Sequence, residues 1–284
     1  MGKIEAVQRD AMVSRVSDTS FLYNVGVLLS RDVKNIIRNP LVMQSRIFQV
    51  NFLAIYTAGL YFGAGRKDYQ DVINWYAIIG YLFFVAMDLF MQAMLPATVT
   101  FPMEKLIFLK EENAKMYTLN QYFLSRNIIE IPYILLIPFL FLLISYWMVG
   151  LANTAEQFFT MYFIILIMSF TATSAGMFGG SIIDDPRSFS NIVTFVTTPL
   201  LAFSGFFKNY NSMPKWIGWV RFISPFNYSF TALVGNETHY KPGRVDELNL
   251  EMSTWTAILI LFCLGVALRF ISYLLLALRK GKLQ

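Results

Sequence analysis

Long uninterrupted apolar runs constrain this sequence more than any other feature. Several of them reach the roughly 20 residues that a helix needs to cross a hydrocarbon layer of about 30 Å. In lipid, every backbone N–H and C=O group must be paired within its own helix or in a closed barrel, and these runs lack the alternating pattern of barrel strands. With 56% apolar and 14% charged residues among 284, the chain holds more apolar side chains than one soluble core of this size buries. The sequence therefore predicts an all-α, polytopic membrane protein.

The apolar runs predict six transmembrane helices, which places both termini on one side of the membrane. Thirteen Lys and Arg residues flank the runs on that side and seven on the other, while the remaining three lie within or at the ends of runs. Because cytosolic flanks carry the excess of positive charge, we expect both termini in the cytosol and a multi-pass protein of the plasma membrane or an organelle membrane. The predicted spans cover residues 47–65, 72–98, 127–151, 157–183, 188–207 and 253–278.

The segment before the first span predicts an amphipathic helix. Apolar side chains recur at helical spacing over residues 21–37 with basic residues between them, and Asn39-Pro40 ends the pattern. Such a helix lies on the membrane surface and meets anionic lipid, although packing against a soluble domain stays open. We therefore expect two parts, a cytosolic segment over 1–44 and a six-helix transmembrane domain over 45–284.

Residues 208–252 form a predicted long extracytosolic loop before the last span. The loop contains two Asn-x-Ser/Thr triplets, which begin at Asn227 and Asn236. This triplet is the acceptor for N-glycosylation on surface loops of the non-cytosolic side. Asn236 is the glycosylation candidate.

The sequence contains few of the residues and motifs that catalysis and metal binding use. A phosphate-binding loop needs Gly-x4-Gly-Lys-Ser/Thr, which the chain lacks. His239 is the single histidine and Cys263 the single cysteine, so His-based metal sites, Ser/His or Cys/His pairs and internal disulfides are not expected. The net charge of +5 is too modest for a nucleic-acid footprint. We expect neither an enzyme nor a metal site in this chain.

Ionisable residues inside the predicted spans need partners. Asp88 lies near the middle of the second span, where an unpaired carboxylate costs at least a few kcal/mol, so it faces a watery cavity or is protonated or satisfied by a neighbouring helix. Arg269 in the last span either snorkels to the cytosolic end or pairs with an acid such as Asp88. Glu130 begins the third span two residues before Pro132, which suits a helix-capping role. Residues 101–119, which carry charges of both signs, look like a solvated loop.

Ordered motifs run along most of the chain. The first group comprises Phe101-Pro102-Met103-Glu104-Lys105, Phe108, Glu111, Tyr117, Tyr122-Phe123, Glu130-Ile131-Pro132, Tyr146 and Gly150-Leu151. The second comprises Gly205-Phe206, Asn209, Pro214, Trp219, Ser224, Tyr228, Ala232-Leu233 and Asn236-Glu237. Over about residues 20–280, these positions resemble ATP-binding-cassette transporters of subfamily G, the White-pigment type.

The resemblance implies the membrane domain of a half-transporter. Two halves, identical or different, would form a dimer and move an amphipathic or lipid-like substrate by alternating access through a central cavity between the second and fifth spans. By their place in the motifs, the cavity residues would be Phe84, Asp88, Phe90, Thr194, Thr197, Thr198 and Leu201. Phe206 and Phe207 would form an extracellular plug.

The same resemblance assigns the parts that would receive ATP-driven motion. The helix before the first span becomes the connecting helix, and the loop over 104–115 contains the coupling helix, with Glu104, Lys105 and Glu111 as the residues that meet the ATPase. ATP and Mg²⁺ would bind a nucleotide-binding domain, which in this family precedes the membrane domain. Because fewer than 50 residues precede the first span, we expect either a fragment of a longer half-transporter or a separate ATPase polypeptide.

Two departures and two alternatives accompany the resemblance. The large loop lacks the cysteines that many members use for disulfides, and Lys105 stands where an arginine is common, although a lysine cannot make a bidentate carboxylate pair. One alternative function is a catalytically silent regulatory subunit or orphan membrane domain that pairs with full half-transporters. An independent secondary carrier would need inverted repeats or several membrane-embedded charges, which the sequence does not show convincingly.

Overall fold

The computed structural model describes residues 20–207, 214, 216–240 and 252–280. Every regular element in these residues is a helix and none is a strand, which confirms the predicted all-α class. The helices are α2 (Phe21–Arg38), α3 (Pro40–Leu60), α4 (Val72–Asn113), α5 (Leu119–Val149), α6 (Ala155–Ile182), α7 (Pro186–Ala202), α8 (Pro225–Tyr240) and α9 (Thr254–Lys280), with short 3-10 helices η1 (Ala64–Arg66) and η3 (Gly218–Phe222).

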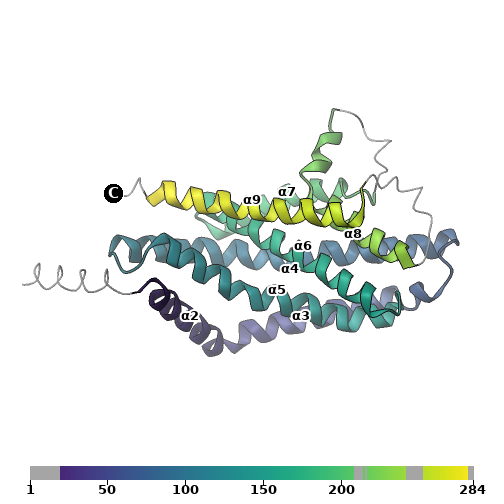
Figure 1. The fold of residues 1–284 in the computed structure, drawn as a ribbon, viewed down its shortest axis with the longest axis horizontal. Coiled ribbons are helices and arrows are strands. Elements are labelled where there is room, and N and C mark those ends of the chain that lie inside the picture. The colour runs from purple at the N-terminus through teal and green to yellow at the C-terminus, as the bar shows by residue number, and fades with distance from the viewer. Residues whose placement is uncertain (1–19, 208–213, 215, 241–251, 281–284) are drawn as a thin grey trace, which may run out of the picture.

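The long helices run roughly alongside one another as an elongated bundle (Figure 1). Helix α2, the turn between α4 and α5, and the C-terminal end of α9 lie together at one end of this bundle, which is called the α2 end below. Helix α8 lies toward the opposite end. The two ends of the described chain thus emerge on the same side, as an even number of crossings requires.

Four helices among the described residues are long and apolar enough to cross a membrane, namely α4, α5, α6 and α9. They correspond to the predicted second, third, fourth and sixth spans. Helix α7 has only 17 residues, fewer than the roughly 20 that a crossing needs, and α3 carries Gln44, Arg46 and Gln49. Six spans therefore stay a prediction. The predicted domain boundary after residue 44 falls inside α3.

Helix α2 has the bounds that its amphipathic pattern predicts. It ends at Arg38, and Asn39 follows as its C-terminal cap before Pro40 opens α3. Its buried residues are Val25 and Leu28, and it packs against α5. The amphipathic helix is confirmed, while its location on a lipid surface stays a prediction.

Helix α4 is longer than predicted, because it continues for 42 residues from Val72 to Asn113. The interpretation of residues 101–119 as a solvated loop is wrong for most of that segment, since only 114–118 lie outside a helix. Phe101, Lys105 and Phe108 explain the continuation, because these side chains at helical spacing are each at most 1% exposed. Their burial extends the packed face of α4 beyond the predicted span.

The predicted long loop before the last span also contains a helix. Among the described residues of 208–252, α8 spans Pro225–Tyr240 and packs against α6 and α9. The Tyr69 hydroxyl donates a 2.5 Å hydrogen bond to Glu237 Oε1 on this helix. Residues 225–240 were predicted to belong to a loop, and this prediction is wrong because they form a largely buried helix.

Local sequence signals set several helix ends. The Asp71 side chain accepts a hydrogen bond from the Ile73 N–H at the start of α4. Thr118 and Gln121 form a capping box at the start of α5. Gly150, whose φ is 77°, ends α5 in the left-handed conformation that glycine adopts without strain.

Helices α4 and α6 pack closely because α6 presents glycines at their interface. A Cβ atom added to Gly176 would lie 2.6 Å from Ala97 Cβ, and one added to Gly180 would lie 2.9 Å from Phe101 Cδ1. Four residues separate these two glycines, which places them on one helix face. Small residues at this spacing allow helices in membranes to approach closely.

We predict that Gly176→Ala destabilises the protein although alanine favours helices. The added methyl overpacks the α4–α6 interface, at a cost of about 1–3 kcal/mol. Gly59→Ala is the matched control, because a Cβ at Gly59 in α3 meets nothing within 4 Å and alanine gains up to about 1 kcal/mol of helix propensity. Thermal unfolding in detergent checks this. Equal melting temperatures for the two variants would contradict the close packing.

Candidate functional site

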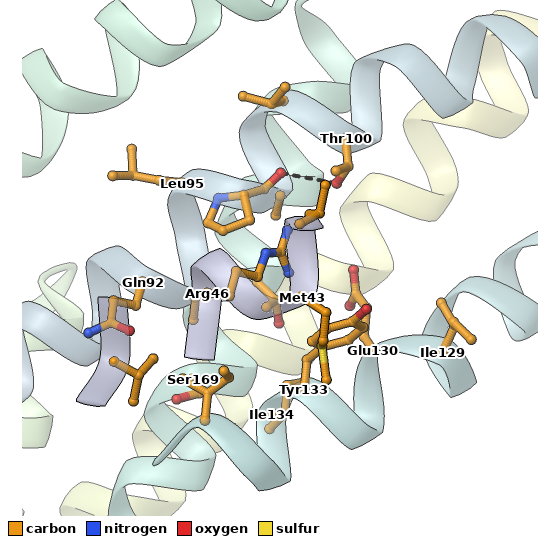
Figure 2. A pocket seen from close by; sticks show the side chains of 18 of the residues that line it. Met43, Arg46, Gln92, Leu95, Thr100, Ile129, Glu130, Tyr133, Ile134 and Ser169 are labelled. Atoms are coloured by element: carbon orange, nitrogen blue, oxygen red, sulfur yellow. Dashed lines mark hydrogen bonds between the residues drawn. The ribbon is translucent and has the colours of Figure 1, made fainter. Parts of the chain in front are cut away.

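A cavity of about 750 Å³ lies between α2, α3, α4 and α5, and α6 also contributes to its lining. Figure 2 shows that side chains from several helices converge on it. This volume falls within the range of pockets that bind small molecules. Polar and charged groups in its lining include Gln49, Asp88, Gln92, Thr100, Glu104, Arg126, Glu130 and Tyr133.

Alternating charges form a network beside the cavity, and three of its four side chains are at most 13% exposed while Glu104 is 36% exposed. Arg126 Nη1 donates a 2.6 Å hydrogen bond to Glu104 Oε1, and its Nε lies 3.3 Å from Glu130 Oε1. Glu130 Oε2 accepts a 2.7 Å hydrogen bond from Arg269 Nη2. Two cations and two carboxylates from α4, α5 and α9 thus neutralise one another. Pairing is necessary because an isolated charge at membrane depth costs several kcal/mol.

The charge network corrects two interpretations. Glu130 does not cap α5, because it lies well inside that helix and its side chain is only 9% exposed. For Arg269, the sequence left two alternatives, snorkelling to the cytosolic end or pairing with an acid such as Asp88. Arg269 pairs with an acid, but the acid is Glu130. Its guanidinium also lies 4.5 Å from the centre of the Phe170 ring and donates to Thr173 Oγ1 at 3.3 Å.

Arg46 is the third cation at this site. It is half-buried, it lines the cavity, and its Cζ lies 5.3 Å from the centre of the Tyr133 ring. Arg46, Arg126 and Arg269 are the three basic residues that lie within or at the ends of the predicted spans rather than in the segments that flank them. The sequence analysis missed Arg46 and Arg126 as site residues, although a basic residue in an apolar run was the available signal.

Asp88 is the one predicted cavity residue that lines this cavity. Gln92, one turn later on α4, donates a 2.8 Å hydrogen bond to Asp88 Oδ2. Phe84 is half-buried and lies outside the lining. Phe90 is only 2% exposed and packs on Phe226 with ring centres 4.5 Å apart. The structure therefore separates Asp88 from the two aromatic residues with which it was grouped.

The predicted cavity residues of α7 lie elsewhere on the single chain. Thr194 and Thr198 are exposed, whereas Thr197 is buried and Leu201 is half-buried. The three threonine hydroxyls each donate to the carbonyl four residues earlier. Because these hydroxyls are hydrogen-bonded to their own helix, the threonines can lie on an apolar helix surface. Their place in a cavity between two halves stays a prediction.

The predicted plug residues gather around an aromatic residue of α4. Phe206 stacks on Phe83 with ring centres 4.5 Å apart, and Phe207 meets the same ring edge-on at 5.1 Å. Phe83, rather than the neighbouring Phe84, is thus the contact between α4 and this segment. The role of Phe206 and Phe207 as a plug stays a prediction.

Lys105 is fully buried at the C-terminal end of α6. Its Nζ donates to the carbonyl oxygens of Gly180, Ser181 and Ile183 at 2.6, 3.3 and 3.3 Å and lies 2.5 Å from Asp184 Oδ1. A compact ammonium with three donors suits these convergent acceptors. The Lys105 ammonium lowers the pKa of the Asp184 carboxyl, to which Arg279 also donates.

Glu111 links the end of α4 to α2. Arg31 Nη1 donates to both Glu111 carboxylate oxygens, at 3.2 and 3.0 Å. The Tyr117 hydroxyl donates to Glu111 Oε2 at 2.5 Å, and both burial and this carboxylate raise the pKa of Tyr117. Of the three predicted coupling residues, Glu111 alone joins the two segments that the resemblance names.

Asn236, the glycosylation candidate, is buried in α8. It is 7% exposed, and its Nδ2 donates a 3.1 Å hydrogen bond to the Gln157 carbonyl oxygen. A glycan on this nitrogen would displace that contact, so the folded arrangement does not favour the modification. Glycosylation at Asn236 stays a prediction.

A helical bundle with several membrane-length helices and a polar cavity among them defines an integral membrane protein of the polytopic helical class. Sequence comparison identifies the family. The chain belongs to the ABC-2 type transporter family, whose profile matches residues 23–238. The family assignment confirms the resemblance drawn from the motifs.

The curated relatives include White and subfamily G transporters. The chain is 27% identical to Protein white of Ceratitis capitata over 80% of its own length and 33% of the relative. It is 28% identical to ABC transporter G family member 14 of Arabidopsis thaliana, with coverages of 76% and 32%. It is 27% identical to the Broad substrate specificity ATP-binding cassette transporter ABCG2 of Rattus norvegicus, with coverages of 83% and 35%. The chain thus spans about a third of the length of these relatives.

We predict that Glu130→Ala strongly destabilises the fold. The substitution leaves Arg126 and Arg269 without their shared carboxylate, and breaking a buried pair costs about 3–5 kcal/mol, or roughly 5–10 °C in apparent melting temperature. Glu156→Ala, an exposed acid on α6, is the control and should change stability little. A double variant, Glu130→Leu with Arg269→Met, should recover part of the loss. No recovery would argue that Glu130 acts through contacts other than this ion pair.

Proposed function

We propose that this chain is the membrane-spanning half of an ATP-driven exporter of the White and subfamily G type. Family membership supports transport, and the names of the subfamily G relatives support ATP as the energy source. The cavity supports an amphipathic or lipid-like cargo, because it combines apolar area with a few polar groups. ATP and Mg²⁺ would be bound by a nucleotide-binding domain that acts with this chain, and ATP hydrolysis would occur there rather than here.

The apolar face that α7 exposes supports dimerisation. Phe195 is 80% exposed, beside the exposed Thr194 and Thr198. A second half placed against this face would cover Phe195 and enclose the threonines between the two halves. Alternating access would then open this central cavity to one side of the membrane at a time, with Phe206 and Phe207 near its outer end.

One observation supports the proposed coupling of ATP hydrolysis to transport. Helix α4 makes ion pairs both with α2, at the α2 end, and with Arg126 in the charge network. Glu111 binds Arg31 of α2, and Glu104, two turns earlier on α4, binds Arg126 beside the cavity. A continuous helix transmits displacement along its axis. Movement imposed on α2 and the end of α4 by an ATPase would therefore reach the cavity.

We predict that Arg31→Ala uncouples ATP hydrolysis from cargo. The variant should fold and keep basal ATPase activity in the complex purified from native membranes, but lose most of the stimulation by cargo, since the Arg31–Glu111 contact between α2 and α4 is gone. Lys34→Ala is the matched control, because Lys34 is exposed on the same helix and makes no ion pair within the described part of the chain. Full stimulation in Arg31→Ala would rule out this contact as the coupling route.

A second prediction concerns Asp88. Asp88→Asn removes the carboxylate charge from the cavity but keeps its shape and its hydrogen bond with Gln92, so transport into proteoliposomes should change in rate or cargo preference without a loss of folded protein. Asp68→Asn, in the turn before α4, serves as control because it lies outside the cavity lining. Identical transport profiles for the wild type and Asp88→Asn would remove Asp88 from the pathway.

A further inference from the structure

We infer that Arg46 binds the anionic group of an amphiphile, a phosphate or a carboxylate, while the apolar part of the molecule lies along the cavity. This inference deepens the proposed function by naming the class of cargo, and it rests on that function for the claim that the bound molecule is transported. The binding site itself is argued from the cavity alone.

Charge pairing leaves Arg46 available. Arg126 and Arg269 neutralise Glu104 and Glu130, which are the acids nearest to them in the network. Arg46 pairs with no carboxylate among the described residues, and its guanidinium instead lies over the Tyr133 ring. A guanidinium stacked on an aromatic ring keeps its edge donors free. Those donors match the oxygens of a phosphate or carboxylate.

The position of Arg46 suits a ligand in the cavity. Figure 2 shows its guanidinium among the side chains that converge on the pocket, between residues of α4 and the Tyr133 region of α5. Helix α3, which carries Arg46, packs closely on α5 and makes few contacts with α4. The cavity therefore occupies the space between α3 and α4, and Arg46 reaches into it from one wall.

Part of the cavity rim is apolar and open toward the surroundings of the bundle, whereas Asn35, Asn39 and Gln49 are exposed polar residues of the lining. Val42 on α3 and Leu95 and Val99 on α4 line the cavity and are 53, 41 and 44% exposed. In a membrane these side chains meet lipid tails, so an acyl chain can enter between α3 and α4 along this apolar part of the rim. Met43 and Leu89 continue the apolar lining inward.

Asp88 sets a limit on the ligand. The Asp88 carboxylate lines the cavity, and its hydrogen-bonding partner is the neutral side chain of Gln92 rather than a cation. Outside the network, the lining holds one cation, Arg46, and two acids, Asp88 and Asp32, of which Asp32 lies 3.5 Å from Arg31 Nε. A single anionic group placed at Arg46 satisfies the cation, whereas a second anionic group would lie in a cavity that also holds the carboxylates of Asp32 and Asp88.

Photolabelling of the full-length protein in neutral maltoside detergent tests the inference. The two probes are photoreactive lysophosphatidic acid and the monoacylglycerol with the same acyl chain, which differ by the phosphate alone. We expect the phosphate probe to label peptides of α3 and α4 at about tenfold lower concentration, the factor that corresponds to one hydrogen-bonded charge contact. Arg46→Gln should abolish that advantage and leave monoacylglycerol labelling unchanged, and Arg46→Lys should restore part of it.

Arg38→Gln is the matched control, because Arg38 is exposed on α2 and lies outside the cavity lining. Unchanged labelling of Arg46→Gln by the phosphate probe, or an equal loss in Arg38→Gln, would overturn the inference, the latter because it would reveal surface attraction only. Size-exclusion profiles and melting temperatures establish that each variant is folded. Photoreactive diacyl phosphatidic acid and a photoreactive fatty acid then show whether membrane phospholipid or free acid is the Arg46-dependent ligand.

The binding assay contains no nucleotide, so it separates the two claims. Loss of Arg46-dependent labelling beside intact ATP-driven transport would contradict this inference alone. Arg46-dependent labelling in a protein that neither binds an ATPase nor transports would contradict the proposed function alone.

Discussion

The pairing of charges within the membrane domain is the constraint on which the rest of this structure depends. Arg126, Glu130 and Arg269 come from the interior of apolar helices, where none of them is tolerated without a partner. Their mutual contacts, extended by Glu104, fix the relative positions of α4, α5 and α9. The cavity lies directly beside this network, so the same side chains that hold the helices together also set the electrostatic character of the space between them.

The length of α4 gives this arrangement its functional meaning. One helix carries Asp88 in the cavity, Glu104 in the network, Lys105 at the end of α6 and Glu111 at the contact with α2. In the proposed mechanism, a displacement of α4 at the α2 end would shift each of these contacts. This geometry suits a transport domain that is driven by a separate energy-converting part, which is the role that family membership supports.

Periodicity in the sequence predicted most helices but not their partners. The pattern of residues 21–37 gave the bounds of α2, and long apolar runs located α4, α5, α6 and α9. The extension of α4 and the burial of α8 were missed because charged residues such as Lys105 and Glu237 look solvated until the neighbouring carbonyls and hydroxyls are known. Glu130 and Arg269 are 139 positions apart in the chain, so local reasoning left snorkelling and pairing open for Arg269 and named Asp88 as the example of an acid rather than Glu130. The predicted site between two halves depends on a second copy, which local patterns in one chain do not position.

The most direct test of the central claim is purification of the protein from its native membrane in gentle detergent, with mass spectrometry and an ATPase assay on the eluate. A half-transporter predicts a nucleotide-binding domain, either in a longer product or as a co-purifying subunit, and vanadate-sensitive ATP hydrolysis that amphiphilic cargo stimulates. A 32.7 kDa product with no nucleotide-binding partner and no ATPase activity would contradict the account and would favour a regulatory or orphan membrane domain.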